Sequence, residues 1–195
     1  VVAAAQARFA AVGYGATTVD AIAADADVSA ATVYGAFGSK RVLFEAAIDQ
    51  AIVGDSESLA LADRAWVAGL AALEDPKEQL RFLYRSLREV YERTAALDRA
   101  IEEAAASDPE LVGLREQHRH AQLEDTRRFR DLVTGARPMF ASLDAQQDVD
   151  ALWAVGSQSV YRLLTEACGW SSEQWESWMA ELMGRLLDTL PDAGD

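Results

Sequence analysis

The sequence is poor in residues that cross-link, break or anchor a chain. It contains one cysteine, Cys168, so no disulfide can form within the chain, which fits a reducing compartment. Only four prolines occur, where they can begin or end helices. No run approaches the roughly 18 consecutive apolar residues of a membrane span, and the opening residues lack a signal-peptide pattern. We therefore expect a cytoplasmic protein that does not interact with membranes.

Positive charge is also scarce. Eighteen lysines and arginines face 32 aspartates and glutamates, and the net charge of −14 excludes general attraction of the whole surface to nucleic acid. The charge is uneven, because residues 1–54 carry −2 and the remainder carries −12. This asymmetry predicts two parts with different functions. The sequence opens at Val1 inside a helical pattern, so we expect upstream residues and any basic arm to precede it.

Alternating strand patterns are absent, whereas apolar residues recur at helical three- and four-residue spacings. We therefore predict an all-α fold. Segment 54–75 is predicted to be partly helical and partly linker. Helices are expected near residues 1–12, 18–25, 29–36, 39–53, 76–93, 95–106, 109–134, 146–167 and 171–190.

Residues 13–41 have the spacing of a helix-turn-helix. Gly13 and Gly15 are suited to end the first helix in a left-handed conformation. Thr17 or Thr18 is suited to cap a first short helix and Ser29 a second, with a sharp turn between them. Lys40 falls in the first turn of the next helix. Two short helices, the second with small outward residues, have the geometry that enters a DNA major groove.

This segment resembles the tetracycline-repressor (TetR) family of bacterial regulators. The resemblance rests on FAAVGYG (9–15), TTVDAIA (17–23), VSAATVY (28–34) and FGSK (37–40). It implies a homodimer whose paired recognition helices, residues 29–36, bind a palindromic double-stranded DNA operator. It also implies a repressor that a small molecule releases. The expected domains are a three-helix DNA-binding domain at 1–53 and a helical effector-binding and dimerisation domain at 54–195.

The resemblance assigns DNA contacts position by position. Thr18 and Tyr34 would contact phosphates, and Lys40 would anchor the DNA backbone. Bases or backbone would be contacted by Ser29, Ala30, Ala31 and Thr32. Alanine methyls can pack on thymine methyls, and the threonine hydroxyl can donate or accept. Many relatives carry basic or bulky polar side chains where this chain has Gly35 and Ala36, so its recognition helix has no positive charge.

The predicted helix 109–134 has a face that is apolar at both ends and polar in the middle. A polar centre on an inward stripe requires water, a partner or a ligand. We expect a small hydrophobic or aromatic effector, although a solvated helix face is the alternative. The expected lining consists of Leu83, Tyr84, Leu87, Tyr91, His118, Gln122, Phe129 and Trp153.

The last two predicted helices carry wide apolar faces with small residues that permit close approach. They resemble half of an intermolecular four-helix bundle. We therefore expect the homodimer to form through residues 146–190.

Enzyme chemistry finds little support. There is no glycine-rich phosphate loop and no nucleophile elbow, and Gly54-Asp55-Ser56 follows a helix instead of a strand. His118 and His120 are two residues apart and point to different sides of a helix, which disfavours a metal site. We expect no catalytic residue, metal or cofactor. The alternative function is a dimeric helical small-molecule-binding protein whose sequence-specific DNA binding is lost or weak.

Overall fold

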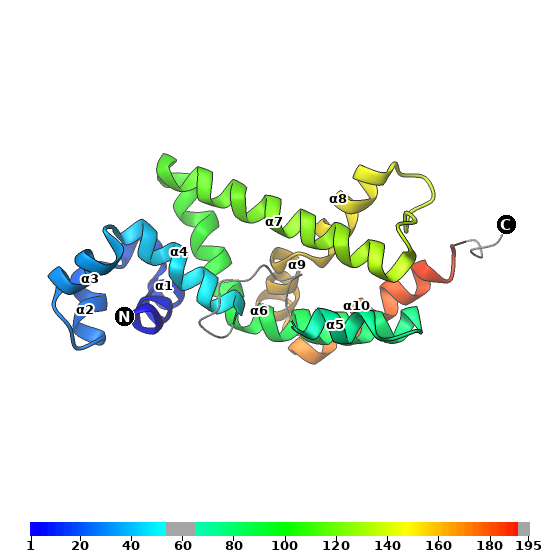
Figure 1. The fold of residues 1–195 in the computed structure, drawn as a ribbon, viewed down its shortest axis with the longest axis horizontal. Helices are drawn as coiled ribbons and strands as arrows, with labels where there is room; N and C mark the ends of the chain where they lie inside the picture. The colour runs from blue at the N-terminus through cyan, green and yellow to red at the C-terminus, as the bar shows by residue number, and fades with distance from the viewer. Residues whose placement is uncertain (54–64, 191–195) are drawn as a thin grey trace. The chain divides into compact units, whose positions relative to one another are not determined.

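The computed structural model describes residues 1–53 and 65–190, and every regular element in these ranges is helical (Figure 1). This observation confirms the all-α prediction. The elements are α1 (Val2–Ala16), α2 (Val19–Asp25), α3 (Ala30–Phe37), α4 (Lys40–Val53), α5 (Ala65–Ala71), α6 (Pro76–Ser107), α7 (Pro109–Thr134), α8 (Ala145–Gly156), α9 (Gln158–Arg162), the π-helical turn η2 (Leu163–Ala167) and α10 (Ser172–Leu187).

The chain divides into two compact units. Unit 1 contains the described residues of Val1–Leu59 together with Arg93–Arg119, and unit 2 contains those of Ala60–Glu92 and His120–Asp195. Each unit has an apolar cluster of its own. The domain boundary predicted after residue 53 stays a prediction.

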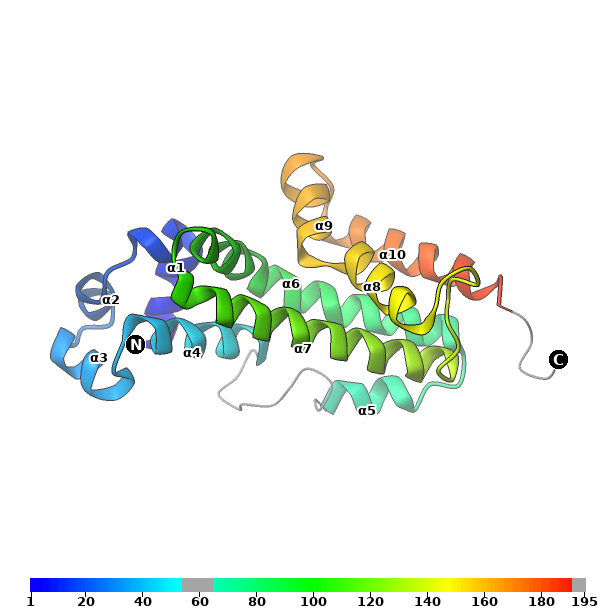
Figure 2. The same cartoon turned by 90° about the horizontal axis from the view of Figure 1, so that it is seen from above.

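One apolar cluster joins the helices of unit 1. Its fully buried members in the first four helices include Phe9, Ile22 and Phe44, and Leu97 and Ile101 of α6 belong to the same cluster. Both views show α2 and α3 side by side with a short connection (Figures 1 and 2). The helix-turn-helix therefore packs against the later part of α6 and does not form a core alone.

Unit 2 is built around aromatic side chains. Trp175 of α10 is fully buried, and its ring centroid lies 5.9 Å from that of Tyr84, 5.3 Å from that of Tyr91 and 5.1 Å from that of Tyr161. Aromatic rings contribute large buried areas and specific edge contacts. This cluster fixes α10 against α6 and α9.

Three elements differ from the sequence expectation. The first helix continues past Gly13 and Gly15 to Ala16, and Gly13 bends it at a φ of 76° that glycine tolerates. The segments expected as 76–93 and 95–106 form the single helix α6, because no glycine or proline follows Pro76 within it. The expected helix 146–167 is interrupted, since the extended backbone of Ser157 ends α8 and its side chain caps α9.

Candidate nucleic-acid interface and ligand site

The helix-turn-helix geometry follows from local capping. The Thr18 side chain accepts a hydrogen bond from the Ala21 amide at 3.2 Å, and that of Ser29 accepts one from the Thr32 amide at 3.0 Å. Between the two helices, Asp27 adopts a left-handed φ of 52°, which aspartate tolerates better than most residues. The connection is therefore sharp. Of the two threonines predicted as caps, Thr18 caps α2, and the predicted Ser29 cap of α3 is confirmed.

The recognition helix α3 has one buried and one exposed face. Val33 is buried in unit 1, whereas Tyr34 is 52% exposed. Among the residues predicted to contact DNA, the exposed ones are Thr18, Ser29, Ala31, Thr32 and Tyr34. Ala30 is half-buried and packs against the core of unit 1. The exposed face of α3 consists of small, hydroxyl and phenol side chains without a formal charge.

Lys40 is only partly exposed, unlike the five residues above, and its ammonium contacts its own chain. Its Nζ donates hydrogen bonds to the backbone oxygens of Tyr14 at 3.0 Å and Thr17 at 3.1 Å. The same Nζ lies 4.0 Å from the centroid of the Tyr14 ring. Burial lowers the pKa of Lys40 from its ordinary value. The sequence indicated a cation at the start of α4, but it gave no signal that this cation contacts the end of α1.

An ion pair joins α1 to α2. The Arg8 guanidinium donates to both carboxylate oxygens of Asp25, with Nη2–Oδ1 at 2.8 Å. Hydrogen bonding to Asp25 raises the pKa of Arg8, and the same bond lowers the pKa of Asp25. Both side chains are well exposed, so the pair contributes little to stability. The pair engages Arg8, one of the few positively charged side chains in residues 1–53.

The predicted effector lining divides into groups. Leu83 and Phe129 are buried together in unit 2 with Leu87 packed against them, in a cluster that also contains Leu70. The Trp66 ring of α5 lies 5.4 Å from the Phe129 ring. This group is an apolar core that joins α5, α6 and α7. Its aromatic member Trp66 was not foreseen, because segment 54–75 lacked a clear pattern.

A polar contact joins two other predicted lining residues of unit 2. The Trp153 indole nitrogen donates to Gln122 Oε1 at 3.1 Å, and both side chains are half-buried. Tyr91 instead contacts Trp175 and donates its hydroxyl to the Gly156 carbonyl oxygen at 2.8 Å. Trp175 itself was missed as a site candidate, although it lies in the last predicted helix, for which a wide apolar face was expected. Its indole nitrogen is buried without a hydrogen-bond partner among the described residues.

His118 belongs to unit 1, unlike the other seven lining residues. Its Nε2 lies 3.8 Å from Asp98 Oδ1, and the two side chains are 16% and 11% exposed. Burial lowers the pKa of His118, while the carboxylates of Asp98, Asp49 and Glu102 oppose that shift. Burial also raises the pKa of Asp49. The structure thus places His118 among carboxylates of α4 and α6.

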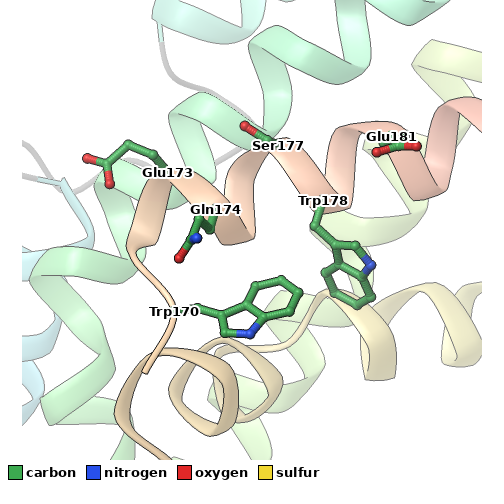
Figure 3. Close-up of a pocket in the computed structure, with 6 residues that line it drawn as sticks. All are labelled: Trp170, Glu173, Gln174, Ser177, Trp178 and Glu181. Carbon is green, nitrogen blue, oxygen red and sulfur yellow. The ribbon is translucent and has the colours of Figure 1, made fainter. Parts of the chain in front are cut away.

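A surface groove of about 430 Å³ follows α10 (Figure 3). The rings of Trp170 and Trp178 lie edge to face at 5.7 Å on one side of the helix, between Glu173 and Glu181. Gln174 and Ser177 complete the lining. The groove falls within the segment 146–190 that was predicted to form the dimer.

Other predicted features can be placed only in part. Within residues 1–53 and 65–190, no group of three side chains is arranged to hold a metal ion. None of the helices in these ranges is long and apolar enough to span a membrane. The Gly54-Asp55-Ser56 segment, considered for hydrolase chemistry, lies outside the described residues.

Comparison with known proteins agrees with this architecture. Residues 1–47 match the family described as "Bacterial regulatory proteins, tetR family". A "Clostridium perfringens putative fatty acid metabolism regulator" is 21% identical with a TM-score of 0.64, over 97% of this chain and 97% of that one. A TetR-like transcriptional regulator from Rhodococcus sp. RHA1 is 22% identical with a TM-score of 0.61, over 97% of this chain and 94% of that one. No curated protein matches the sequence.

The family match covers the helix-turn-helix, and the solved structures cover nearly the whole chain. Residues 1–47 therefore carry the helix-turn-helix of the TetR family of bacterial regulatory proteins, and the chain as a whole has the fold of TetR-family transcriptional regulators.

Proposed function

We propose that the chain is a cytoplasmic transcriptional repressor that binds a palindromic operator as a homodimer and is released by a small molecule. The observation that carries this proposal is the exposed face of α3, which follows a sharp turn and begins at a capped Ser29. A helix with such an exposed face can enter the major groove, with half-sites about 34–36 Å apart in the dimer.

The proposed contacts follow from the chemistry of this face. The Thr32 hydroxyl and the methyl of Ala31 are suited to base edges, and the hydroxyls of Thr18, Ser29 and Tyr34 are suited to phosphates. Ala30, which is half-buried, is proposed to support the close approach of the helix to DNA. Because α3 offers no formal positive charge, we expect modest affinity and a weak dependence of binding on salt.

Dimerisation is proposed through residues 146–190. Leu163 of η2 is 58% exposed in the single chain, and the groove on α10 adds two partly exposed indole rings. Large apolar side chains gathered on one surface are typical of protein interfaces. A two-fold interface here would cover both features and would pair two recognition helices for a palindromic site.

The effector is proposed to be hydrophobic or aromatic, with one or two hydrogen-bonding groups. The support is the apolar cluster of Leu83, Leu87 and Phe129 in the unit that also holds the half-buried pair Gln122 and Trp153. One structurally similar protein is described as a fatty acid metabolism regulator, which makes long-chain acyl compounds natural test ligands. A coupling of about 1–3 kcal/mol between effector and DNA would change operator affinity roughly 5–150-fold.

The test is selection of DNA fragments from a random pool by the purified protein, followed by binding measurements on the enriched sequence. We expect enrichment of a pseudo-palindrome and a measurable preference over unrelated duplexes. Tyr34→Phe should weaken binding to all sequences, whereas Thr32→Ala should change the base preference at one position in each half-site. Binding that depends on salt but never on sequence would refute the repressor proposal.

The alternative is a dimeric helical protein that binds small molecules and has lost or weakened DNA recognition. The uncharged exposed face of α3 favours it, because Arg8 is paired with Asp25 and Lys40 contacts backbone oxygens. This alternative predicts ligand-induced stabilisation without enrichment of any DNA sequence. Within the described residues, no group of side chains supports a catalytic function, and we propose no such function.

A further inference from the structure

Lys40 connects the start of α4 to the segment that leads from α1 into α2. Its ammonium donates to the carbonyl oxygens of Tyr14 and Thr17, at 3.0 and 3.1 Å. These oxygens belong to residues 26 and 23 positions earlier in the chain. Charge-assisted hydrogen bonds are stronger than neutral ones. The Lys40 side chain therefore ties the corner between α1 and α2, residues 13–18, to the first residue of α4.

The ammonium is largely occupied by these contacts. An ammonium has three N–H donors, and two of them are directed to the carbonyl oxygens. The Tyr14 ring lies 4.0 Å from Nζ and is itself held by Phe9 and Phe44, with centroids 5.8 and 5.0 Å away. This arrangement is a cation–π contact on a partly buried ring that packs against the core of unit 1. Lys40 is consequently anchored on its own chain and is only partly exposed.

The same corner is built from further backbone bonds. The Thr17 amide donates to the Tyr14 carbonyl oxygen at 3.3 Å, so this oxygen accepts from both Thr17 and Lys40. The buried Thr17 hydroxyl donates to the Gly13 carbonyl oxygen at 2.7 Å, at the bend of α1. Thr18, the next residue, begins α2. The placement of the helix-turn-helix on α1 and α4 thus depends on these few bonds.

We propose that Lys40 acts as a positioning residue, which sets the orientation of α2 and α3 by holding the Tyr14 and Thr17 carbonyl oxygens. This inference rests on the proposed DNA binding. It replaces the phosphate contact that the family resemblance implied for Lys40. A positioning lysine and a phosphate-binding lysine both support affinity, but they differ in their effect on the salt dependence of binding.

The salt dependence separates the two roles. A lysine that neutralises a phosphate contributes about 0.9 to the slope of log affinity against log salt concentration. A lysine that acts through backbone carbonyl oxygens contributes much less. Lys40→Met should therefore weaken binding to the selected DNA about tenfold or more while the slope changes by less than about 0.3. Lys40→Arg should weaken binding similarly, because a planar guanidinium cannot reproduce the ammonium's contacts within the same space.

The matched control is Arg8→Gln, which also removes one positive charge from the first four helices, at an exposed site. It should leave the affinity within about threefold of the unmodified chain. A slope that falls by about 0.9 in Lys40→Met, together with recovery of affinity and slope in Lys40→Arg, would overturn the proposal in favour of phosphate contact. Unchanged affinity in both Lys40 variants would overturn it as well.

Amide hydrogen exchange of the free protein tests the corner independently of DNA. We expect the Thr17 amide and the first amides bonded within α2 to exchange at least about tenfold faster in Lys40→Met, while those of α10 keep their rates. Unchanged exchange at Thr17 would overturn the positioning role even if the protein binds DNA. If the unmodified chain selects no DNA sequence, the proposed repressor function fails, and the exchange rates alone decide whether Lys40 holds the corner. Should Lys40→Met not fold, the same measurements on Lys40→Arg decide the question.

Discussion

Arg130 and Asp148 form a buried ion pair that holds α7 to α8. Arg130 Nη1 lies 3.1 Å from Asp148 Oδ2, and the two side chains are 6% and 0% exposed. The other oxygen of Asp148 accepts the amides of Met139 and Phe140 at 2.7 and 2.9 Å. A carboxylate without access to water is tolerated only when its oxygens are satisfied in this way. Asp148 therefore determines the conformation of the segment between α7 and α8.

Asp148→Ala should destabilise unit 2 by about 2–4 kcal/mol, because it leaves two amides without their acceptor and removes one of the two carboxylates paired with the buried Arg130 guanidinium, which keeps Asp131. All five tryptophans lie in unit 2, so urea unfolding followed by tryptophan fluorescence reports on this unit. The control is Asp150→Ala, which removes an exposed carboxylate two residues away and should change stability by no more than about 0.5 kcal/mol. Equal stabilities of the two variants would contradict the importance of the buried pair.

Contacts between residues close in sequence could be predicted, whereas contacts between residues distant in sequence could not. Ser171 and Gln174 form a reciprocal cap at the start of α10, a pairing that the sequence can indicate because both partners lie within one turn. His118 and Gln122 were assigned to one inward stripe of α7, yet their contacts include Asp98 and Trp153, respectively, which are distant in sequence. Helical periodicity indicates which face is turned inward, but not which segment lies against it.

The role of Lys40 shows the same limit. A lysine at a helix start is a plausible phosphate ligand by local criteria, and only the return of the chain brings the Tyr14 and Thr17 carbonyl oxygens within reach. Interruptions of helices by single residues were also missed. Ser157 has no strong tendency to break a helix, and its extended conformation becomes favourable when its side chain caps α9.

His118 should make the stability of unit 1 depend on pH. Burial lowers its pKa below the ordinary value of 6.5, so the unfolded chain takes up this proton more readily than the folded one. The stability contributed by neutral His118 is therefore complete above about pH 6.5 and is lost as the pH falls below it. Asp49, whose pKa burial raises, acts with the opposite sign, and its acid form favours the folded state.

Replacement of His118 tests its contribution to the pH dependence of the stability of unit 1. His118→Gln should reduce the loss of stability between about pH 7 and pH 5, since the variant has no histidine at this position to take up a proton on unfolding. It also removes the histidine charge that lowers the pKa of Asp49, which acts in the same direction. Hydrogen exchange of α4 amides, measured at several pH values, follows unit 1 separately from the tryptophans. The control is His120→Gln, which removes an exposed histidine of the same helix. Parallel pH profiles for the unmodified chain and His118→Gln would contradict the prediction.

Leu163 tests the proposed dimer without disturbing the fold of the single chain. Because its side chain is 58% exposed, Leu163→Glu removes little from the core of unit 2. If residues 146–190 form the interface, the new charge would be buried there and should raise the dimer dissociation constant about 10–100-fold. Sedimentation velocity over a range of concentrations measures this change. Val112→Glu, at a 37% exposed position outside that segment, should leave the association unchanged. Two variants that dissociate equally would place the interface elsewhere.

Gln122 and Trp153 supply the polar groups to which the proposed effector would bind. The indole nitrogen donates to Gln122 Oε1 at 3.1 Å, and an effector bearing a carbonyl or carboxylate group could accept a hydrogen bond from the Gln122 amide nitrogen. A ligand is first found as a compound that raises the unfolding temperature, from a panel of fatty acids and aromatic acids. Gln122→Ala should then weaken the response to that ligand about tenfold, since one hydrogen-bonding group of the site is lost. Its affinity for the selected DNA should stay within about threefold of the unmodified chain.

Gln117→Ala, which removes an exposed amide from the same helix, is the matched control and should respond to ligand normally. If Gln122→Ala and Gln117→Ala respond alike, the polar middle of α7 is only a solvated face and the effector binds elsewhere.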